Sequence, residues 1–203
     1  MTDTFSHWDE VYKNKDHTQV SWHQSHSTVS FDWIVEFAQK QDAIVDVGCG
    51  VSILTDNLLA EGFTDISLLE LSTAALETLK TRLQKSSKKL TFYNNNVLDF
   101  EPSQTFKLWH DRAVFHFLTD SKDQQIYLQK LSKYLDKDGL FLLATFSPDG
   151  PKECSKLDIV QYDQEKISKL LGDKFKFIKT INEKHPHPNG SIQSFNYFLF
   201  QKK

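Results

Sequence analysis

The sequence predicts an α/β fold, a doubly wound and mostly parallel seven-stranded sheet that ends in a C-terminal antiparallel hairpin strand. Short apolar runs alternate with amphipathic segments along most of the chain, which is typical of a parallel sheet covered by helices on both faces. A glycine turn at 48–50 joins the first apolar run to a helical segment. The last two apolar runs are separated by the short turn Pro188-Asn189-Gly190, and so short a connection requires antiparallel strands.

The composition favours one globular domain. The chain has 203 residues, of which 39% are hydrophobic and 25% charged, so it can form one normal core. We expect a single domain over 1–203, with an aromatic, helical N-terminal extension over 1–40 and a sheet core over 41–203. A net charge of −3 gives no electrostatic footprint for nucleic acid or an anionic membrane surface, so we expect neither as a partner.

The remaining bulk features predict a cytoplasmic location. No apolar run approaches the ~20 residues of a transmembrane helix, and the first residues lack the pattern of a signal peptide. The two cysteines, Cys49 and Cys154, show no zinc-ligand spacing and no disulfide framework, so no metal is expected.

Two helices are predicted in the N-terminal extension. Residues 5–13 and 30–39 each repeat apolar side chains at the spacing of one helical face. A polar loop lies between them and contains His17, Trp22, His23 and His26.

The core elements follow in order along the chain. The apolar run 43–47 predicts a buried strand, and helix 52–61 follows it, closed by Gly62. A second strand is predicted over residues 65–70. Ser72 is a good N-cap for helix 73–84, whose leucines share a face.

The second half of the core continues the alternation. Apolar runs predict strands over 89–93, 106–110 and 140–146, and a helical pattern covers 122–136. Asp163 and Gly172 bound a predicted helix over 164–171 as N-cap and C-terminal glycine. Residues 175–181 and 192–200 are the two strands of the final hairpin.

The segment Asp46-Val47-Gly48-Cys49-Gly50 predicts a ligand site at the end of the first strand. Gly48 and Gly50 allow the backbone to approach a ligand, and we expect backbone N–H groups of the turn to converge there. The carboxylate of Asp46 favours a cationic or hydroxyl-rich group over a bare phosphate. Glu70 ends the second strand, where an acidic residue can accept from two ribose hydroxyls. The amide of Asn96 can bind the edge of a purine.

A nicotinamide dinucleotide is the competing ligand. Its fingerprint needs a third glycine, and this chain has Ile53 at that position. Asp46 would also lie near the pyrophosphate and repel it. A nicotinamide-dependent oxidoreductase is therefore disfavoured.

These segments resemble motifs one to three of the class I S-adenosylmethionine-dependent methyltransferases. The motifs are Asp46-Val47-Gly48-Cys49-Gly50, Leu69-Glu70-Leu71-Ser72 and Asn96-Val97-Leu98-Asp99-Phe100, and the similarity covers about residues 30–146. The last hairpin fits the reversed seventh strand of that Rossmann-like fold. Many members carry Asp where this chain has Asn96.

The resemblance implies S-adenosyl-L-methionine as the cofactor. Gly48 and Gly50 would pass under the methionine moiety, and Asp46 would lie near its amino group. Glu70 would hold the ribose and Asn96 the adenine, with Leu71 and Val97 beside them in the cofactor site.

Aromatic residues of the extension are candidates for covering the cofactor. Tyr12 and Trp22 could each place a ring over the sulfonium, a cation–π contact of roughly 0.5–2 kcal/mol. Trp8 is expected to serve ordinary packing. The arrangement is similar to entry segments of small methyltransferases, including several that act on protein lysines.

Candidate catalytic residues follow the fourth strand. Asp111 is the best-placed carboxylate for steering the acceptor or accepting its proton, and Arg112 is expected to pair with it. His116 is either a base or a histidine packed between Phe115 and Phe117. The loop 146–155 suits a lip that contacts the substrate, and its Cys154 is not expected to act as a nucleophile.

Four functions remain open from the sequence. The leading one is methyl transfer to a small-molecule acceptor, and the second is a protein-lysine methyltransferase of the same fold. A non-catalytic cofactor-binding protein and the oxidoreductase are the weaker alternatives. The absence of an Asn/Asp-Pro-Pro-Tyr segment argues against methylation of DNA adenine or glutamine. The pattern leaves the acceptor and the oligomeric state open.

Overall fold

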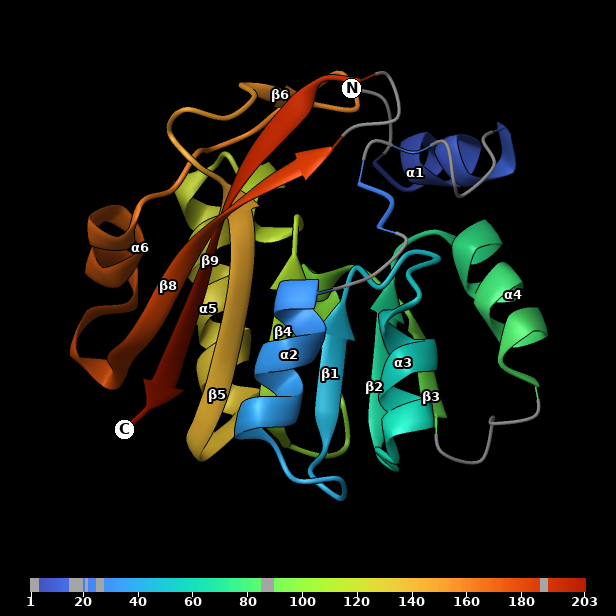
Figure 1. Ribbon diagram of the computed structural model, residues 1–203, viewed down its shortest axis with the longest axis horizontal. Coiled ribbons are helices and arrows are strands. Elements are labelled where there is room, and N and C mark those ends of the chain that lie inside the picture. The colour runs from blue at the N-terminus through green and yellow to red at the C-terminus, as the bar shows by residue number, and fades with distance from the viewer. Residues whose placement is uncertain (1–3, 15–19, 21, 25–27, 85–89, 187–189) are drawn as a thin grey trace.

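A seven-stranded sheet forms the centre of the molecule, with strands in the order β3-β2-β1-β4-β5-β9-β8 (Figure 1). The computed structural model describes residues 4–14, 20, 22–24, 28–84, 90–186 and 190–203. The strands of this sheet are β1 (Ile44–Val47), β2 (Ile66–Glu70), β3 (Leu90–Asn94), β4 (Phe106–Arg112), β5 (Leu135–Phe146), β8 (Phe175–Pro186) and β9 (Ile192–Lys202).

The strand pairing confirms the predicted fold class. β1 pairs in parallel with β2 and β4, β2 with β3, and β4 with β5. β9 runs antiparallel to both β5 and β8, as the short final connection requires. Pro188 and Asn189 of the predicted turn lie outside the described residues.

Helices cover both faces of the sheet, as the alternating pattern predicts. One face packs against α2 (Thr28–Phe37), α3 (Leu54–Glu61) and α4 (Thr73–Arg82), and the other against α5 (Ser121–Tyr134) and α6 (Gln164–Leu171). Side chains alternate between the faces along each strand: Leu108 of β4 joins the first core and Trp109 joins the second.

Local sequence signals set several element ends. Ser72 accepts a hydrogen bond from Ala75 N at the start of α4, and Asp163 accepts one from Lys166 N at the start of α6. Gly62 ends α3 in the left-handed conformation, with φ of 101°. These three predicted caps are confirmed.

The junction between α5 and β5 differs from the prediction. The helix ends at Tyr134 and the strand begins at Leu135, whereas the pattern predicted a helix to 136 and a strand from 140. Asp138 has a positive φ of 59°, and the register of β5 against β4 shifts between Phe106 and Leu108. A bulge of this kind adds strand residues that period-2 patterning does not reveal.

The N-terminal extension contributes two helices of different character. α1 (Thr4–Asn14) lies over the start of α4 (Figure 1), whereas α2 places Trp33 and Ile34 in the hydrophobic core. The predicted division at residue 40 stays a prediction. His17 and His26 of the intervening loop lie outside the described residues.

Two short segments complete the chain path. After β5 the chain forms a small hairpin of β6 (Glu153–Cys154) and β7 (Leu157–Asp158). Single 3₁₀ turns include η2 (Val97–Asp99) after β3 and η3 (Phe115–Phe117) after β4. Among the described residues, no helix combines the length and apolar character needed to span a membrane.

Candidate functional site

A cavity of about 250 Å³ opens at the carboxyl ends of the parallel strands, beneath α1. This is the edge at which open α/β sheets bind their ligands. Its lining includes these residues predicted for the cofactor: Tyr12, Trp22, Gly48, Glu70, Leu71, Asn96 and Val97. Other lining residues, outside the predicted set of cofactor-binding residues, include Trp8, Leu98, Arg112, Phe117, Asp123 and Cys154.

The glycine turn is held from inside the protein. Gly48 and Gly50 have positive φ of 64° and 53°, which favours glycine. The N–H groups of Gly48 and Cys49 both donate to the Leu69 carbonyl, at 2.7 and 3.2 Å. The expectation that N–H groups of this turn converge on a ligand is therefore wrong for Gly48, Cys49 and Gly50, because their donors are used internally.

What the glycines supply instead is space. A Cβ on Gly48 would collide with a methyl of Val114, and a Cβ on Gly50 would collide with the Tyr12 hydroxyl. Gly48 lines the cavity, whereas Gly50 is covered by Tyr12. The turn therefore lets the neighbouring segments and the cavity approach the end of β1 closely.

Glu70 is fixed at the end of β2 by both of its oxygens. Oε2 accepts from Gly50 N at 2.9 Å and Oε1 accepts from Ser72 N at 2.8 Å. Burial raises the pKa of this carboxyl, and the backbone donors oppose that shift. Each oxygen keeps a second lone pair, so the anchored carboxylate can still accept ribose hydroxyls from the cavity.

Asn96 lines the cavity but has a structural bond of its own. Its Oδ1 accepts from Leu98 N at 2.9 Å and caps the η2 turn. The predicted contact of this oxygen with an adenine amine can use only its remaining lone pair. Leu71 and Val97 flank the same end of the cavity and supply apolar surface.

Four aromatic rings meet at the other end of the cavity. Trp8 contacts Trp22 and Phe117 edge-on, with centroid distances of 5.7 and 5.2 Å, and Tyr12 meets Trp22 at 6.0 Å. All four line the cavity. Trp8, expected to serve ordinary packing, thus belongs to the cavity wall as well.

Asp46 lies beneath the glycine turn in a buried hydrogen-bonded chain. Its Oδ1 is 2.6 Å from His110 Nδ1, and His110 Nε2 is 2.8 Å from Ser30 Oγ. These residues line a second cavity of about 50 Å³, which also touches Gly48 and Arg112. The residue types are those of a serine nucleophile triad, but so small a cavity has room for little more than water. The chain of bonds orients Asp46 toward His110.

Asp111 points into the second core, away from both cavities. It accepts from Val114 N at 2.9 Å, from Phe115 N at 3.1 Å and from Tyr127 Oη at 2.6 Å. Burial raises its pKa to about 6 against the effect of these donors. The carboxylate therefore holds the turn after β4 onto α5 and does not reach the cavity.

His116 is also buried outside both cavities. Its ring packs against Phe117 and Phe146, with centroid distances of 4.5 and 4.9 Å. Neither ring nitrogen has a hydrogen-bond partner within the described part of the chain. Burial lowers its pKa to about 3, and the charge of Arg112 acts in the same direction. His116 is thus a neutral, packed side chain at physiological pH.

Arg112 does not pair with Asp111, and this expectation is wrong. Successive residues of a strand face opposite sides of the sheet. Asp111 therefore points to the side that α5 covers, and Arg112 points to the opposite side, where it reaches Tyr197 of β9. Arg112 Nε donates to Tyr197 Oη at 2.9 Å and Nη1 donates to the Trp22 carbonyl at 3.0 Å. The period-2 alternation of β4 was the signal that could have separated the two residues.

The cysteines act as buried thiols. Cys154 lines the cavity from the loop predicted as a lip, and burial raises its pKa to about 11. Burial and the nearby Glu70 raise the pKa of Cys49 as well. Both are free of disulfides, and the described ranges contain no cluster of His, Cys, Asp and Glu suited to a metal ion.

The arrangement fits the predicted cofactor in its chemistry. One cavity is bordered by an anchored carboxylate on β2, an amide after β3, the glycine turn after β1 and an aromatic wall. These match a nucleoside with hydroxyls joined to a cationic sulfur. The roles of the individual residues stay predictions.

Comparison with known proteins assigns the family. The sequence profile described as "Methyltransferase domain" matches residues 38–195. Malonyl-[acyl-carrier protein] O-methyltransferase 1 of Ilyobacter polytropus is 29% identical over 147 residues, which are 72% of this chain and 52% of that protein. EEF1A lysine methyltransferase 2 of Mus musculus is 24% identical over 160 residues, which are 70% of this chain and 65% of that protein.

A solved structure shares the whole fold. It is Burkholderia thailandensis 1,6-didemethyltoxoflavin-N1-methyltransferase, with its bound 1,6-didemethyltoxoflavin and S-adenosylhomocysteine. The TM-score is 0.72 at 14% identity, over 98% of this chain and 84% of the other.

Proposed function

This chain belongs to the family of methyltransferase domains, and from that premise we propose that it transfers a methyl group from S-adenosylmethionine to a small-molecule acceptor. The observation that carries the proposal is the single cavity that joins Glu70, Asn96 and the glycine turn to an aromatic wall. The chain spans about half to two thirds of the length of the two curated relatives described above. Their activities therefore guide the proposal and do not define it.

The residues of the chain bind and orient in this mechanism. S-adenosylmethionine supplies a methyl group on a positively charged sulfur, which is already activated for displacement. Glu70, fixed by two backbone donors, would accept hydroxyls of the ribose, and Asn96 with Val97 would hold the adenine. Tyr12 and Trp22 would exclude water from the bound cofactor and supply aromatic surface to its cationic end. Alignment of acceptor, methyl carbon and sulfur can account for much of the rate.

In the transfer, a lone pair of the acceptor forms the bond to the methyl carbon and the carbon–sulfur electron pair stays on sulfur. A base is needed only for an acceptor that must lose a proton. Both bases predicted from the sequence, Asp111 and His116, lie outside the cavity, so neither contacts the acceptor in this mechanism. An acceptor that is already deprotonated, or that loses its proton to water, suits this site.

Two acceptor classes have support from relatives. The malonyl-[acyl-carrier protein] O-methyltransferase favours a small acyl acceptor. The EEF1A lysine methyltransferase keeps a protein lysine as the second candidate. A lysine acceptor would have to lose a proton, and neither Asp111 nor His116 lines the cavity to accept it. We also propose a cytoplasmic location, in keeping with the two free thiols.

Cofactor binding is the first test. Calorimetry on the purified protein should show that it binds S-adenosylhomocysteine with an affinity at least a hundredfold higher than its affinity for NAD. Glu70→Gln should weaken S-adenosylhomocysteine binding about tenfold, which corresponds to about 1.4 kcal/mol. Glu61→Gln, an exposed acid paired with Lys40, is the matched control and should bind like wild type. Equal affinity for NAD and S-adenosylhomocysteine would remove the cofactor assignment.

The acceptor class is the second test. The protein is incubated with methyl-labelled S-adenosylmethionine and a cell lysate separated into metabolites and proteins. Label in the metabolite fraction supports the small-molecule acceptor. Label confined to a protein band, lost after lysine residues are chemically blocked, would replace it with the lysine acceptor.

A further inference from the structure

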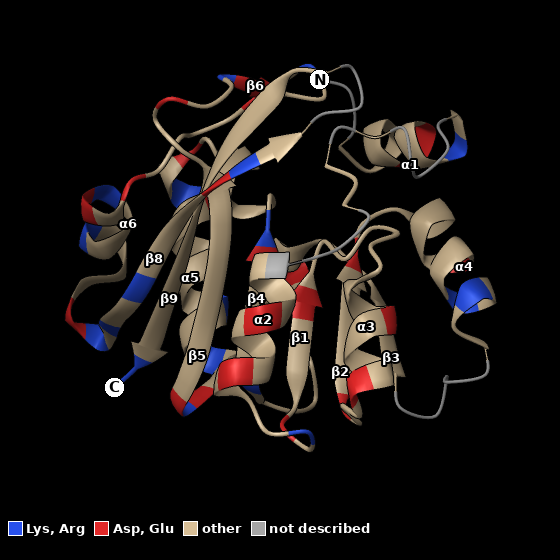
Figure 2. Cartoon of the chain, in the orientation of Figure 1, with Lys and Arg blue, Asp and Glu red and all other residues tan. Residues whose placement is uncertain are grey.

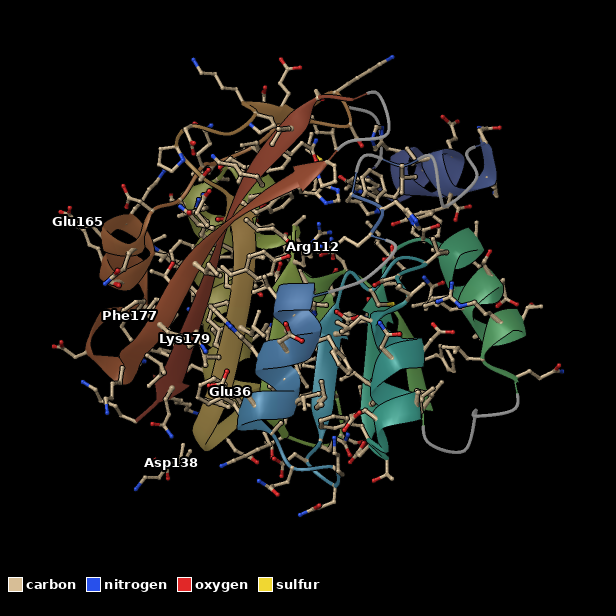
Figure 3. The ribbon with its side chains drawn as sticks, viewed as in Figure 1. Glu36, Arg112, Asp138, Glu165, Phe177 and Lys179 are labelled. Carbon is tan, nitrogen blue, oxygen red and sulfur yellow. The ribbon has the colours of Figure 1, made fainter. Side chains whose placement is uncertain are left out.

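Arg112 lies at the carboxyl end of β4 (Figure 3). Its guanidinium is held there but is incompletely paired. Nε and Nη1 donate to the Tyr197 hydroxyl and the Trp22 carbonyl, and the group stacks on the Phe195 ring at 4.8 Å. Tyr197 in turn donates to Glu183 at 3.0 Å. Three contacts, from β9 and from the Trp22 segment, thus fix the orientation of the side chain.

That remaining nitrogen, Nη2, is buried and has no hydrogen-bond partner among residues 4–14, 20, 22–24, 28–84, 90–186 and 190–203. No carboxylate of these residues forms an ion pair with Arg112 either. Arg112 reaches the carboxylate of Glu183 only through the Tyr197 hydroxyl, and a buried N–H without an acceptor is costly. An anionic ligand would supply both an acceptor for Nη2 and a direct counter-charge.

The place of Arg112 suggests which ligand this is. It lines the large cavity at the aromatic end with Trp8, Trp22 and Phe117, while Glu70 and Asn96 lie toward β2 and β3. If the nucleoside lies at Glu70 and Asn96, the acceptor occupies the end that contains Arg112. We propose that Arg112 binds a carboxylate of the methyl acceptor and so selects carboxylic acids. This inference rests on the proposed methyl transfer.

The charge of the site favours a carboxylate over a phosphate group. Arg112 is the one cationic side chain among the described residues that line the large cavity, and Asp123 and Glu70 add negative charge there. A single guanidinium balances a carboxylate, whereas a doubly charged phosphate would keep an excess charge. A carboxylate is ionised at neutral pH, with a pKa near 4, so it also needs no base in the site.

The methionine moiety of S-adenosylmethionine carries a carboxylate too, and the second cavity brings Arg112 near Gly48. The test must therefore separate two sources of the same chemical group. S-adenosylhomocysteine contains this carboxylate and 5′-methylthioadenosine lacks it. The affinities of both compounds for each variant identify the source.

The experiment compares wild type, Arg112→Gln and Arg112→Lys in calorimetry. Monoethyl malonate, acetate and benzoate are titrated into the protein saturated with S-adenosylhomocysteine, and neutral diethyl malonate is the matched ligand control. We expect at least one of the acids, but not the diester, to bind wild type. Arg112→Gln should weaken that binding at least tenfold, with S-adenosylhomocysteine affinity within twofold of wild type. Arg112→Lys, which keeps the charge without the planar fork, should show an intermediate loss.

Lys179→Gln is the protein control. Lys179 lies on β8, well apart from Arg112 in Figure 3, and its charge is already paired with Glu36 at 2.8 Å. Thermal melts of all variants identify any that fail to fold. If Arg112→Gln does not fold, the comparison rests on Arg112→Lys and wild type.

Three results would overturn the proposal. The first is that no acid binds wild type, and the second is that acids bind Arg112→Gln as well as wild type. The third is that Arg112→Gln loses affinity for S-adenosylhomocysteine while its affinity for 5′-methylthioadenosine is unchanged. This result would mean that Arg112 binds the carboxylate of the cofactor and not that of the acceptor. Failure of wild type to bind S-adenosylhomocysteine at all would instead reject the proposed function itself.

Discussion

Asp111 shows how a single residue can be committed to structure despite a position next to the site. Both of its oxygens accept hydrogen bonds, from the backbone of Val114 and Phe115 and from the Tyr127 hydroxyl. Tyr127 itself accepts from Trp109 Nε1 at 3.0 Å. The carboxylate therefore ends a buried polar chain that ties β4 to α5.

Replacing Asp111 by Asn should lower stability and leave cofactor binding unchanged. The amide nitrogen of Asn would face the Tyr127 hydroxyl, whose proton then loses its acceptor inside the core. A buried donor without an acceptor costs about 1–3 kcal/mol, which corresponds to a fall in Tm of roughly 2–12 °C for a chain of this size. Differential scanning calorimetry measures the Tm, and titration with S-adenosylhomocysteine measures the affinity.

Tyr127→Phe is the matched control, because it breaks the same hydrogen bond from the other side. Its Tm should fall by a similar amount. A drop in cofactor affinity in Asp111→Asn at unchanged Tm would contradict this role and place Asp111 in the site.

Residue identities in the site could be predicted only in part. The glycine turn, Glu70 and Asn96 follow from spacing, because the carboxyl ends of parallel strands meet at one edge. Asp111 and Arg112 were assigned the wrong partners, because proximity in sequence suggested an ion pair that a strand does not allow. The partners of Arg112, Trp22 and Tyr197, lie about 90 and 85 residues away along the chain. No local pattern reveals a contact at that separation.

At the scale of the elements, a charged anchor attaches α1 to the start of α4. Asp9 accepts from Ala74 N and Ser72 Oγ, each at 2.9 Å, at the start of α4. Lys13 Nζ forms an ion pair with the other oxygen of Asp9, Oδ2, at 2.7 Å. These donors lower the pKa of Asp9 to about 2, and its negative charge also suits the positive end of the α4 dipole.

Asp9→Asn should loosen α1 and weaken cofactor binding through the aromatic wall. The substitution removes charge from three hydrogen bonds, and charged bonds contribute about 1.5–3 kcal/mol each against roughly half of that for neutral ones. Trp8 and Tyr12 lie on the same helix and line the cavity. We expect a three- to tenfold loss of S-adenosylhomocysteine affinity by calorimetry, with little change in the global Tm.

Glu10→Gln provides the control for that experiment, since Glu10 is an exposed acid on the same helix. It should bind like wild type. Unchanged affinity in Asp9→Asn would mean that α1 does not help to form the binding site.

Element prediction succeeded where caps and periodicity agree. Ser72 and Asp163 mark the starts of α4 and α6 correctly, because an N-cap is a local hydrogen bond. The start of β5 was missed because a bulge is set by pairing with β4 rather than by the local sequence. The small hairpin of β6 and β7 was missed because strands of two residues carry no periodic signal.

At the scale of the whole molecule, the two faces of the sheet have different tasks. The face that carries α2 holds the polar chain of Asp46, His110 and Ser30 and the side chain of Arg112. The face that carries α5 holds Asp111 in a core of aromatic rings. Acidic and basic segments are interspersed over the outer elements (Figure 2). Charge selectivity is therefore concentrated at the strand ends. The alternation predicts the parallel sheet that brings these ends to one edge, but not the order of its strands.

Burial on this scale also sets the dependence of stability on pH, and two groups act in opposite directions. The folded state keeps His116 neutral until a pKa of about 3, whereas an unfolded histidine takes up its proton near pH 6.5. Acidification from about 6.5 toward 3 therefore favours unfolding. In the folded state Asp111 has a pKa of about 6, whereas in the unfolded chain its pKa is 3.8. Acidification between these two pH values therefore favours folding. Each effect changes the free energy of unfolding by about 1.4 kcal/mol per pH unit, and between about pH 6 and 4 they cancel.

His116→Phe should expose the hidden contribution of Asp111. The variant keeps a ring between Phe117 and Phe146 but has no proton to exchange. Relative to wild type, its free energy of unfolding should rise as the pH falls from 6 to 4, by up to about 1.4 kcal/mol per pH unit. Urea unfolding at pH 6.0, 5.0 and 4.5 measures the difference, in which groups common to both proteins drop out. Asp111→Asn should deviate from wild type in the opposite direction over the same range. Parallel profiles for wild type and His116→Phe would mean that the fold does not hold His116 neutral, because a histidine free to protonate contributes no slope.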